Sequence, residues 1–479
     1  MHPGNDIVVI SGGTATNELV SLFKSLSDRV TYILPILDNG GSTSEILRVI
    51  GGPAIGDLRS RLNRLIPERH EHIRRLLSYR MSEDARSAKH EWEEIVDGIH
   101  PLWNGFDKAE KEIFRSFLIH VHVELLKKSR SHPTNQFPPL MFHFELANIG
   151  NLFLTGARLF VGSLDSAVVL FSRLTGIDEK VQVLPCINTN FTYHIAAALE
   201  NGLIITGQSQ ISHPSTSLQE PLGDPLRLQT LSVNTIERHP FVESPSHSHS
   251  QKDDYMGNYL ESEFSEDSEI EESGNVPFYV HPELKKSQLH FNKVDSGPLL
   301  SPIKRIFYIS PYGEEIRPSA YHKTLSSIVE TDVLVYSIGS LMTSISPIII
   351  LNGVGKAIAR DSKRNRSQKK VLLLNGEPDR ETFGMTAVDF VKTIVSLASY
   401  SLSQDRVFSS SEYEDHCKNL AWNRYVTHLF FMKGSGFHVD KSVLEAEKNI
   451  KCIEIALDRE RTGYDLMDLE SKFKGLLYV

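Results

Sequence analysis

The chain contains 479 residues, of which 40% are hydrophobic and 23% are charged, as in an ordinary globular protein. No apolar run approaches the ~20 residues that span a bilayer, and Met1–Asp6 lacks the regions of a signal peptide. Three widely spaced cysteines (Cys186, Cys417 and Cys452) match neither a disulfide framework nor a zinc pattern, so we expect a cytoplasmic protein that binds no membrane. The net charge of -9 comes mostly from Glu261–Glu272, with seven acidic residues and no basic one. The rest is nearly neutral and has no basic stripe, which argues against a nucleic-acid partner.

Apolar strands near the N-terminus end in glycines and run into helices. Strand Ile7–Ile10 leads through Gly12–Thr14 into an amphipathic helix, and strand Val30–Leu37 leads through Asp38–Thr43 into another. A third loop, Gly51–Asp57, opens a further helix. This order predicts a right-handed βαβ unit in a parallel sheet.

The remainder of the chain divides into segments that differ in composition and in hydrophobic periodicity. A charged segment with helical periodicity follows the third loop, and a Ser-rich, acidic segment poor in core-forming residues interrupts the second half. Further strands are predicted at 181–187, 306–309, 333–338, 371–374 and 427–432, with a strand of a hairpin at 203–207 and a charged helix around 443–449. The predicted organisation is: 1–66, first half of an α/β domain; 67–138, helical insert; 139–212, α/β domain continued; 213–300, largely disordered acidic insert; 301–400, second half of the α/β domain; 401–479, its C-terminal completion.

The glycine loops predict a composite anion site. A strand that ends in glycines and feeds a helix presents unpaired backbone N–H groups to a phosphate. In open parallel sheets ligands bind at the carboxyl ends of the strands, where the loops at Gly12, Asp38, Gly339 and Asn375 would converge. No GxxxxGK[ST] phosphate loop is present, so an ordinary P-loop kinase or GTPase is not expected.

For each charged or hydroxyl side chain beside these loops, the sequence is compatible with two roles. Asp38 is a candidate for contact with a divalent metal or a sugar hydroxyl, or it orders its own loop as an Asx turn. Asp57 either caps the helix that follows it or contacts ligand or metal. Arg48 and Arg59 either bind phosphate oxygens or are ordinary surface arginines. Ser340 either caps a helix or contacts the ligand.

At these residues the chain resembles the CofD/YvcK superfamily of 2-phospho-L-lactate transferases and YvcK-type gluconeogenesis factors. The resemblance implies a Rossmann-like, three-layer α/β fold with a mostly parallel sheet, which binds a nucleotide or nucleotide sugar. The matching elements are Gly12-Gly13-Thr14, Asp38-Asn39-Gly40-Gly41-Ser42, Leu47-Arg48 with Gly56-Asp57-Leu58-Arg59, Ile149-Gly150-Asn151-Leu152, Gly339-Ser340-Leu341 with Thr343-Ser344-Ile345, and Asn375 leading to Gly384–Asp389.

The site residues predicted from the loops and the resemblance fall into three groups. Asp38, Asp57 and Arg59 are candidates for catalysis, and Asp38 and Asp57 are candidates for binding Mg²⁺. The ligand-binding candidates are Gly12, Gly13, Thr14, Asp38, Asn39, Gly40, Gly41, Ser42, Thr43, Arg48, Asn151, Gly339, Ser340, Ser344 and Asn375.

The loop sequences are closer to the YvcK branch than to the CofD enzymes. CofD enzymes usually carry a second carboxylate where this chain has Asn39, which argues against a two-carboxylate metal site. Ser44-Glu45 stands where the YvcK pattern generally has Gly and a basic residue, and one extra residue precedes Leu47-Arg48. This departure predicts that Glu45 alters which ligand is accepted.

Three functions follow from these features. The first is a regulator of carbon or cell-wall metabolism that binds a UDP-sugar-like ligand. The second is a metal-dependent phosphotransferase resembling 2-phospho-L-lactate transferase. The third is a scaffold whose acidic insert binds a protein partner, with Ser268 as a candidate phosphorylation site. A homodimer is compatible with each of them.

Overall fold

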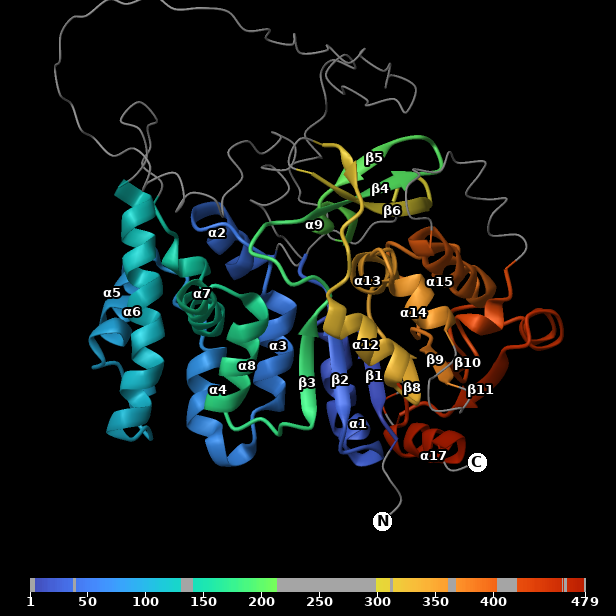
Figure 1. The fold of residues 1–479 in the computed structure, drawn as a ribbon, viewed down its shortest axis with the longest axis horizontal. Coiled ribbons are helices and arrows are strands. Elements are labelled where there is room, and N and C mark those ends of the chain that lie inside the picture. The colour runs from blue at the N-terminus through green and yellow to red at the C-terminus, as the bar shows by residue number, and fades with distance from the viewer. Residues whose placement is uncertain are drawn as a thin grey trace, which may run out of the picture.

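A seven-stranded parallel sheet forms the centre of the molecule (Figure 1). The computed structural model describes residues 5–37, 40–130, 141–212, 299–310, 313–360, 368–402, 420–458, 460 and 463–477. The strand order is β11-β10-β9-β8-β1-β2-β3, and each neighbouring pair is parallel. Their bounds are β1 Ile7–Ile10, β2 Val30–Leu34, β3 Val181–Pro185, β8 Val333–Tyr336, β9 Lys369–Leu373, β10 His428–Met432 and β11 Lys451–Ile455.

The central strands are continuous apolar runs because both faces of the sheet are covered by helices. Every residue of β1, β8 and β10 is buried. Ile7 of β1 pairs with Val30 on one side and with Val333 on the other, which places β1 in the middle of the sheet. The predicted strands at 7–10, 30–37, 181–187, 333–338, 371–374 and 427–432 are therefore confirmed, with ends shifted by a few residues.

Two sets of helices flank the sheet. Right-handed crossovers that step in opposite directions place their helices on opposite faces, and β1–β2 steps away from β8–β9–β10. On one face α1 packs against α17; on the other, α12 packs against α14, and α13 and α14 pack against α15. The bounds are α1 Val20–Leu26, α12 His322–Glu330, α13 Ser346–Ile349, α14 Val354–Ala359, α15 Ala387–Leu402 and α17 Leu466–Leu477.

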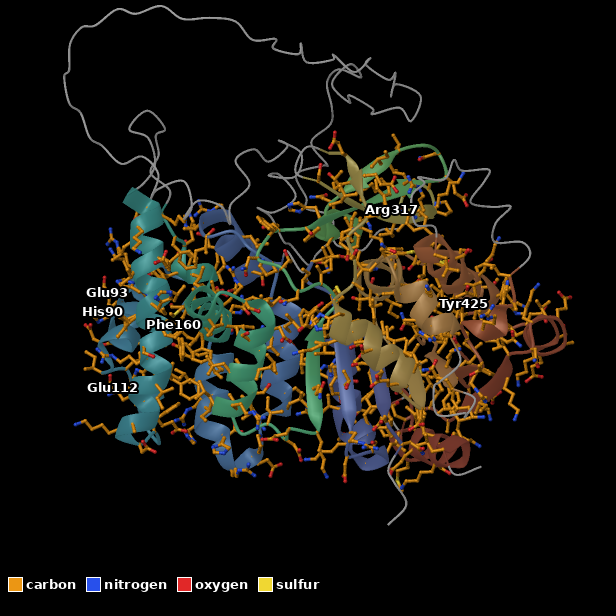
Figure 2. All side chains as sticks on the ribbon, in the orientation of Figure 1. His90, Glu93, Glu112, Phe160, Arg317 and Tyr425 are labelled. Carbon is orange, nitrogen blue, oxygen red and sulfur yellow. The ribbon has the colours of Figure 1, made fainter. Side chains whose placement is uncertain are left out.

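Among the described residues, the α-helices α2 to α8 lie between β2 and β3 in the chain and extend the molecule beyond the β3 edge (Figure 1). The described residues of the predicted 67–138 insert include α4, α5 and α6. The helices α4 and α6 pack mainly against α7, and α5 packs against α6 and the short helix at Phe144–Leu146 rather than against the sheet. In Figure 2 the side chains of His90, Glu93 and Glu112 lie on the outer surface of α5 and α6, while Trp92 is buried inside. The bounds are α2 Gly41–Val49, α3 Gly56–Leu65, α4 Glu71–Ser78, α5 Ala85–Asp97, α6 Lys108–Arg130, α7 Ile149–Val161 and α8 Leu164–Leu174.

A small antiparallel sheet, which the sequence did not predict as a separate layer, lies beyond the carboxyl ends of the parallel strands (Figure 1). Its order is β5-β4-β6-β7, and a short helix, α9, follows β5. The predicted hairpin strand 203–207 and the strand at 306–309 both belong to it. The bounds are β4 His194–Leu199, β5 Ile204–Thr206, β6 Ile303–Ile309, β7 Glu315–Ile316 and α9 Gln208–Ser212.

The predicted fold class, a Rossmann-like α/β fold with a mostly parallel sheet, is confirmed. The tail adds β11 and α17, which the sequence did not predict, and its predicted charged helix is a π-helix at Ser442–Glu447. The acidic insert and Ser268 lie outside the described residues. None of the helices in the described part of the chain has the length and apolar composition needed to cross a membrane.

Candidate functional site

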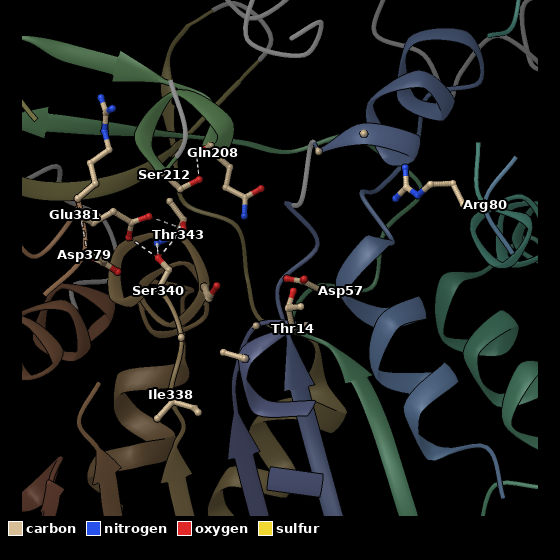
Figure 3. A pocket seen from close by; sticks show the side chains of 18 residues that line it. Thr14, Asp57, Arg80, Gln208, Ser212, Ile338, Ser340, Thr343, Asp379 and Glu381 are labelled. Carbon is tan, nitrogen blue, oxygen red and sulfur yellow. Dashed lines mark hydrogen bonds between the residues drawn. The ribbon is translucent and has the colours of Figure 1, made fainter. Parts of the chain in front are cut away.

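A cavity of about 840 Å³ opens at the carboxyl edge of the sheet, between the loops that follow β1 and β8 (Figure 3). The chain leaves β1 toward β2 and leaves β8 toward β9, in the opposite direction. This divergence is the switch point at which open α/β sheets bind ligands. Nine of the predicted site residues line the cavity: Gly12, Gly13, Thr14, Gly40, Gly41, Asp57, Gly339, Ser340 and Ser344.

The first glycine loop is packed closely against the protein's own side chains. A Cβ on Gly12 would lie 2.6 Å from the Oγ of Ser344, and a Cβ on Gly13 would collide with the carboxylate and backbone of Asp57. Small residues are therefore required where the β1 loop meets α3 and the segment after β8. The glycines serve this internal packing in addition to any approach of a ligand, which was the reason given by the sequence.

Asp57 lies in the first turn of α3, with 8% of its surface exposed to the cavity side. The N-cap position belongs to Ile55, which has no side-chain capping bond, so the prediction that Asp57 caps the helix is wrong. A carboxylate in the first turn still interacts favourably with the helix dipole. The contact of Asp57 with a ligand or metal stays a prediction.

Arg61, one turn further along α3, is buried directly beneath the same loop. Its Nη2 donates to the carbonyl oxygen of Gly12 at 3.2 Å and to the Oγ of Ser11 at 3.4 Å. The guanidinium lies 4.7 Å from the centre of the Tyr32 ring, while Nε and Nη1 are buried without a hydrogen-bond partner. Desolvation lowers the pKa of Arg61 to about 10, opposed by attraction to Tyr32 and Asp57. A cation thus lies behind the amides that line the cavity.

The loop after β8 is fixed by two side chains. Asn375, at the end of β9, accepts from the N–H of Gly339 at 3.0 Å and donates to its carbonyl oxygen at 2.7 Å. Ser340 caps the π-helix η8 (Leu341–Ile345) by accepting from the N–H of Thr343 at 2.9 Å, which confirms the capping alternative. Asn375 itself lines a second cavity of about 770 Å³, which shares Gly339 and Ser340 with the first.

Glu381 is a buried carboxyl group in the cavity wall that the sequence analysis missed. It accepts from the Oγ of Ser340, from the N–H of Met342 at 3.1 Å and from the Oγ1 of Thr343 at 2.9 Å. Burial, assisted by the charge of Asp379, raises its pKa to about 7 in spite of these three donors. The available signal was a run of charged residues, 377–381, just after the Asn375 loop.

Charged groups lie on two sides of the cavity. Figure 3 shows Arg80 on one side and Asp379 and Glu381 on the other, with Asp57 and Thr14 between them. Arg380, which stands between Asp379 and Glu381 in the chain, also lines the cavity. A Cβ on Gly41 would lie 3.7 Å from the Nη1 of Arg80, so this guanidinium stands beside the N-terminus of α2. The acidic side also carries Gln208 and Ser212 from α9. The cavity therefore offers a cationic end and an end rich in hydrogen-bonding groups.

Six predicted site residues in the described part of the chain do not line this cavity, and hydrogen bonds within the protein engage their side chains; Asn375, above, is one of them. Arg59 Nε donates to Asn151 Oδ1 at 3.1 Å, and Asn151 Nδ2 donates to Thr43 Oγ1 at 3.4 Å. Ser42 Oγ accepts from the N–H of Asn148 at 2.9 Å. These bonds join α2, α3 and α7 behind the cavity.

Arg48 and Glu45 likewise bond to partners within the protein and not to the cavity. Arg48 donates to both carboxylate oxygens of Glu45, at 2.8 and 2.6 Å, and Glu45 Oε1 also accepts from the N–H of His143 at 2.6 Å. Glu45 is 3% exposed and lies away from the cavity lining, so the expectation that it alters the choice of ligand has no support here. The pair fastens α2 to the segment before α7.

The predicted magnesium site pairs Asp38 with Asp57. Asp57 offers the oxygen donor that Mg²⁺ prefers, but Asp38 and Asn39 lie outside the described residues. In the described chain, the group of metal-ligand types within 4.8 Å of one another is His70, His72 and Glu110, in the helical region. Those atoms are already engaged, because His72 Nε2 lies 3.0 Å from Glu110 Oε2 and Arg69 donates to His70.

Comparisons with known proteins agree with this architecture. A family model described as 2-phospho-L-lactate transferase CofD matches residues 7–454. The uncharacterized protein YNL011C of Saccharomyces cerevisiae is 43% identical over 457 residues, which are 94% of this chain and 95% of the yeast protein.

Two bacterial proteins show weaker similarity to this chain. A “Putative gluconeogenesis factor” of Yersinia pestis is 45% identical over 62 residues, covering 13% of this chain and 20% of that protein. The solved structure of BH3568 from Bacillus halodurans, a member of the UPF0052 family, has a TM-score of 0.55 at 16% identity and covers 98% of both chains. The last likeness shows a common fold.

Proposed function

Because the chain belongs to the CofD family, we propose that its cavity binds a nucleotide or a nucleotide sugar of the UDP-sugar type, as a regulatory ligand. The diphosphate lies at the cationic end, near Gly41 and Arg80, and the glycine loops supply backbone amides. The similarity to proteins named as gluconeogenesis factors supports a role in carbon or cell-wall metabolism.

The observation that carries the proposal is the buried Arg61 cation beneath the Gly12 carbonyl. Burying a charge is costly, and within the described residues Arg61 forms no salt bridge. The attraction of Asp57 offsets this cost only in part, because the pKa of Arg61 is still lowered to about 10. An anion bound on the other side of the loop would offset that cost. Charge-assisted contacts of phosphate with arginine and backbone N–H groups supply the attraction.

Calorimetric titration with UDP-glucose, UDP-N-acetylglucosamine and GDP tests this function. We expect at least one of them to bind, and Arg80→Ala to weaken that binding by roughly tenfold or more, the effect of one lost charged hydrogen bond. Arg86→Ala, an exposed arginine at the start of α5 away from the cavity lining, is the matched control. Absence of binding by all three compounds overturns the proposal.

A phosphotransfer reaction is the second candidate, favoured by the carboxyl groups of Asp57 and Glu381, which line the same cavity. Asp57 would hold Mg²⁺, which would neutralise charge on the leaving phosphate. Phosphorus NMR of GTP or UDP-glucose with protein and Mg²⁺ measures turnover. Turnover that persists in excess EDTA contradicts the metal role, and loss of turnover in a folded Asp57→Asn variant supports it.

A further inference from the structure

We propose that the wall made by Glu381, Ser340 and Thr343 binds the sugar hydroxyl groups of the ligand, and that this binding expels a proton from Glu381. The inference rests on the proposed function, in which the diphosphate of the same ligand lies at the cationic side of the cavity. It makes Glu381 a specificity-determining residue that couples ligand affinity to pH.

The hydrogen-bond geometry of the wall is the first support. Glu381 is 5% exposed, yet it belongs to the cavity lining. Its Oε2 accepts from Ser340 Oγ and Met342 N–H, and its Oε1 accepts from Thr343 Oγ1. Ser340 Oγ also accepts from the N–H of Thr343 at 2.9 Å and lies 2.6 Å from Thr343 Oγ1. When both hydroxyl protons face the ionised carboxylate, no proton lies between these two oxygens, and together they form an acceptor for a sugar O–H.

The charged groups around Glu381 leave its ionisation sensitive to changes in hydrogen bonding at the wall. Within the described chain no lysine, arginine or histidine forms a salt bridge with it, and Asp379 is the neighbouring charge that acts on it. The π-helix η8 contributes Met342 and Thr343, and α9 contributes Gln208 and Ser212, none of which titrates near neutrality. Asp57, Arg80 and Arg380 are the other charged groups that line the cavity.

The coupling follows from the two protonation states. With a pKa of about 7, Glu381 is roughly half protonated at neutral pH, and the neutral acid must itself donate a hydrogen bond to one of the hydroxyls. Hydrogen bonds donated to a carboxylate favour its ionised form. A sugar that donates to the Ser340 and Thr343 oxygens reinforces the arrangement in which both hydroxyl protons face Glu381. Binding therefore lowers the pKa of Glu381 and releases a proton.

The position of the wall directs the sugar rather than the diphosphate to it. Figure 3 places Glu381 and Asp379 opposite Arg80, and these two carboxyl groups outnumber the one cation, Arg380, that the same loop adds to the lining. The balance of charge at this end therefore disfavours phosphate. Carboxylate, amide and hydroxyl groups from the 379–381 loop, η8 and α9 gather at this end. They are the usual partners of uncharged sugar hydroxyls, whereas a phosphate requires cations and N–H donors.

Titration of the full chain with UDP-glucose in two buffers of different ionisation enthalpy, from pH 6 to pH 8, tests the inference. UDP-glucose carries no phosphate group that titrates in this range, so the exchanged proton comes from the protein. We expect release of about half a proton at pH 7 and an affinity that rises roughly fivefold to tenfold between pH 6 and pH 8. The wild-type profile tests the idea even if a variant fails to fold.

Glu381→Gln is the diagnostic variant, because it keeps the shape and removes the titration. We expect no proton release near pH 7 and a smaller difference in affinity between UDP-glucose and UDP than the wild type shows. Proton release that persists in this variant, or wild-type binding without proton exchange, overturns the inference and leaves the proposed function standing. No binding of UDP-glucose, UDP-N-acetylglucosamine or GDP by the wild type overturns both.

Discussion

The side-chain amide of Asn375 holds Gly339 by both of its backbone groups, with bonds of 3.0 and 2.7 Å. The two residues follow neighbouring strands, β9 and β8, and Gly339 has a φ of +132°, a conformation that glycine tolerates far better than other residues. This clasp sets the loop that presents Ser340 to the cavity. The resemblance predicted Asn375 as a ligand contact, and the structure gives its amide a positioning task.

Removing the clasp should weaken the site more than the fold. For Asn375→Ala we expect a loss of about 1–3 kcal/mol in the free energy of unfolding, because two buried backbone groups lose their partner. Asn375→Asp should be worse, since its carboxylate would face the Gly339 carbonyl oxygen. Urea melts and UDP-glucose titrations measure both effects. Asn201→Ala, in an exposed turn, is the control, and equal losses in Asn201→Ala and Asn375→Ala would contradict this account.

Gly13 should tolerate no side chain. A Cβ there would collide with Asp57, including its backbone Cα at 2.7 Å, so Gly13→Ala must displace α3 or the β1 loop and cost about 2–4 kcal/mol. Gly475→Ala, in helix α17 with nothing within 4 Å of the added Cβ, should stabilise the protein by up to about 1 kcal/mol. Thermal melts compare the two. A Gly13→Ala variant as stable as wild type would sink the packing argument.

The stability lost in a Gly12→Ala variant should be restored by a second substitution at Ser344. The Cβ of Gly12→Ala would meet Oγ and Cβ of Ser344 at 2.6 and 3.0 Å, so the single variant should be destabilised. Ser344→Gly removes both atoms, and the double variant should regain much of the lost stability. Denaturation of the two single variants and the double variant gives the coupling energy. Strict additivity of the two losses is the result that contradicts a direct contact.

The raised pKa of Glu381 should be visible in the pH dependence of the free energy of unfolding. Its pKa is raised from 4.5 to about 7, so between these values the native state binds more protons than the unfolded state, and stability falls as pH rises. The full shift corresponds to about 3 kcal/mol, lost between roughly pH 4.5 and pH 7. Glu381→Gln should abolish this loss and be more stable than wild type above pH 7.

The comparison between variants is needed because three histidines act in the opposite sense. Burial lowers the pKa of His122, and it lowers the pKa of His194 and of His428 to about 4. Protonation of the unfolded chain therefore destabilises the protein as pH falls from 6.5 to 4. Urea melts at pH 5, 6, 7 and 8 for wild type and Glu381→Gln separate the contributions. Parallel pH profiles for the two proteins would refute the assignment.

Arg48 should matter for stability and not for the ligand. Its guanidinium is paired with Glu45 behind the cavity, so Arg48→Ala should leave a buried carboxylate unpaired and cost about 1–3 kcal/mol. The affinity for UDP-glucose should stay within about twofold of wild type. A large loss of affinity in a stably folded Arg48→Ala variant would restore the phosphate contact that the sequence suggested.

Local patterns in the sequence determined the strands and the glycine loops of this protein. An apolar run such as Val333–Tyr336 with glycine behind it reports its own burial and its own turn, and neither depends on distant residues. The ordered motifs were specific enough to indicate the family. Sheet edges were harder, because β11 (Lys451–Ile455) is only partly buried and charged, so its periodicity is weak.

Tertiary structure alone decided which chemistry faces the cavity. Glu381 reaches Ser340 across 41 residues of chain, and Arg61 is buried only because α3 packs beneath the β1 loop. Arg48, Arg59 and Asn151 stood in the right motifs, but their side chains turn to partners within the protein. Sequence spacing fixes which backbone segments meet at the end of a sheet; the direction of each side chain, and hence its solvation and charge, depends on how the helices pack around them.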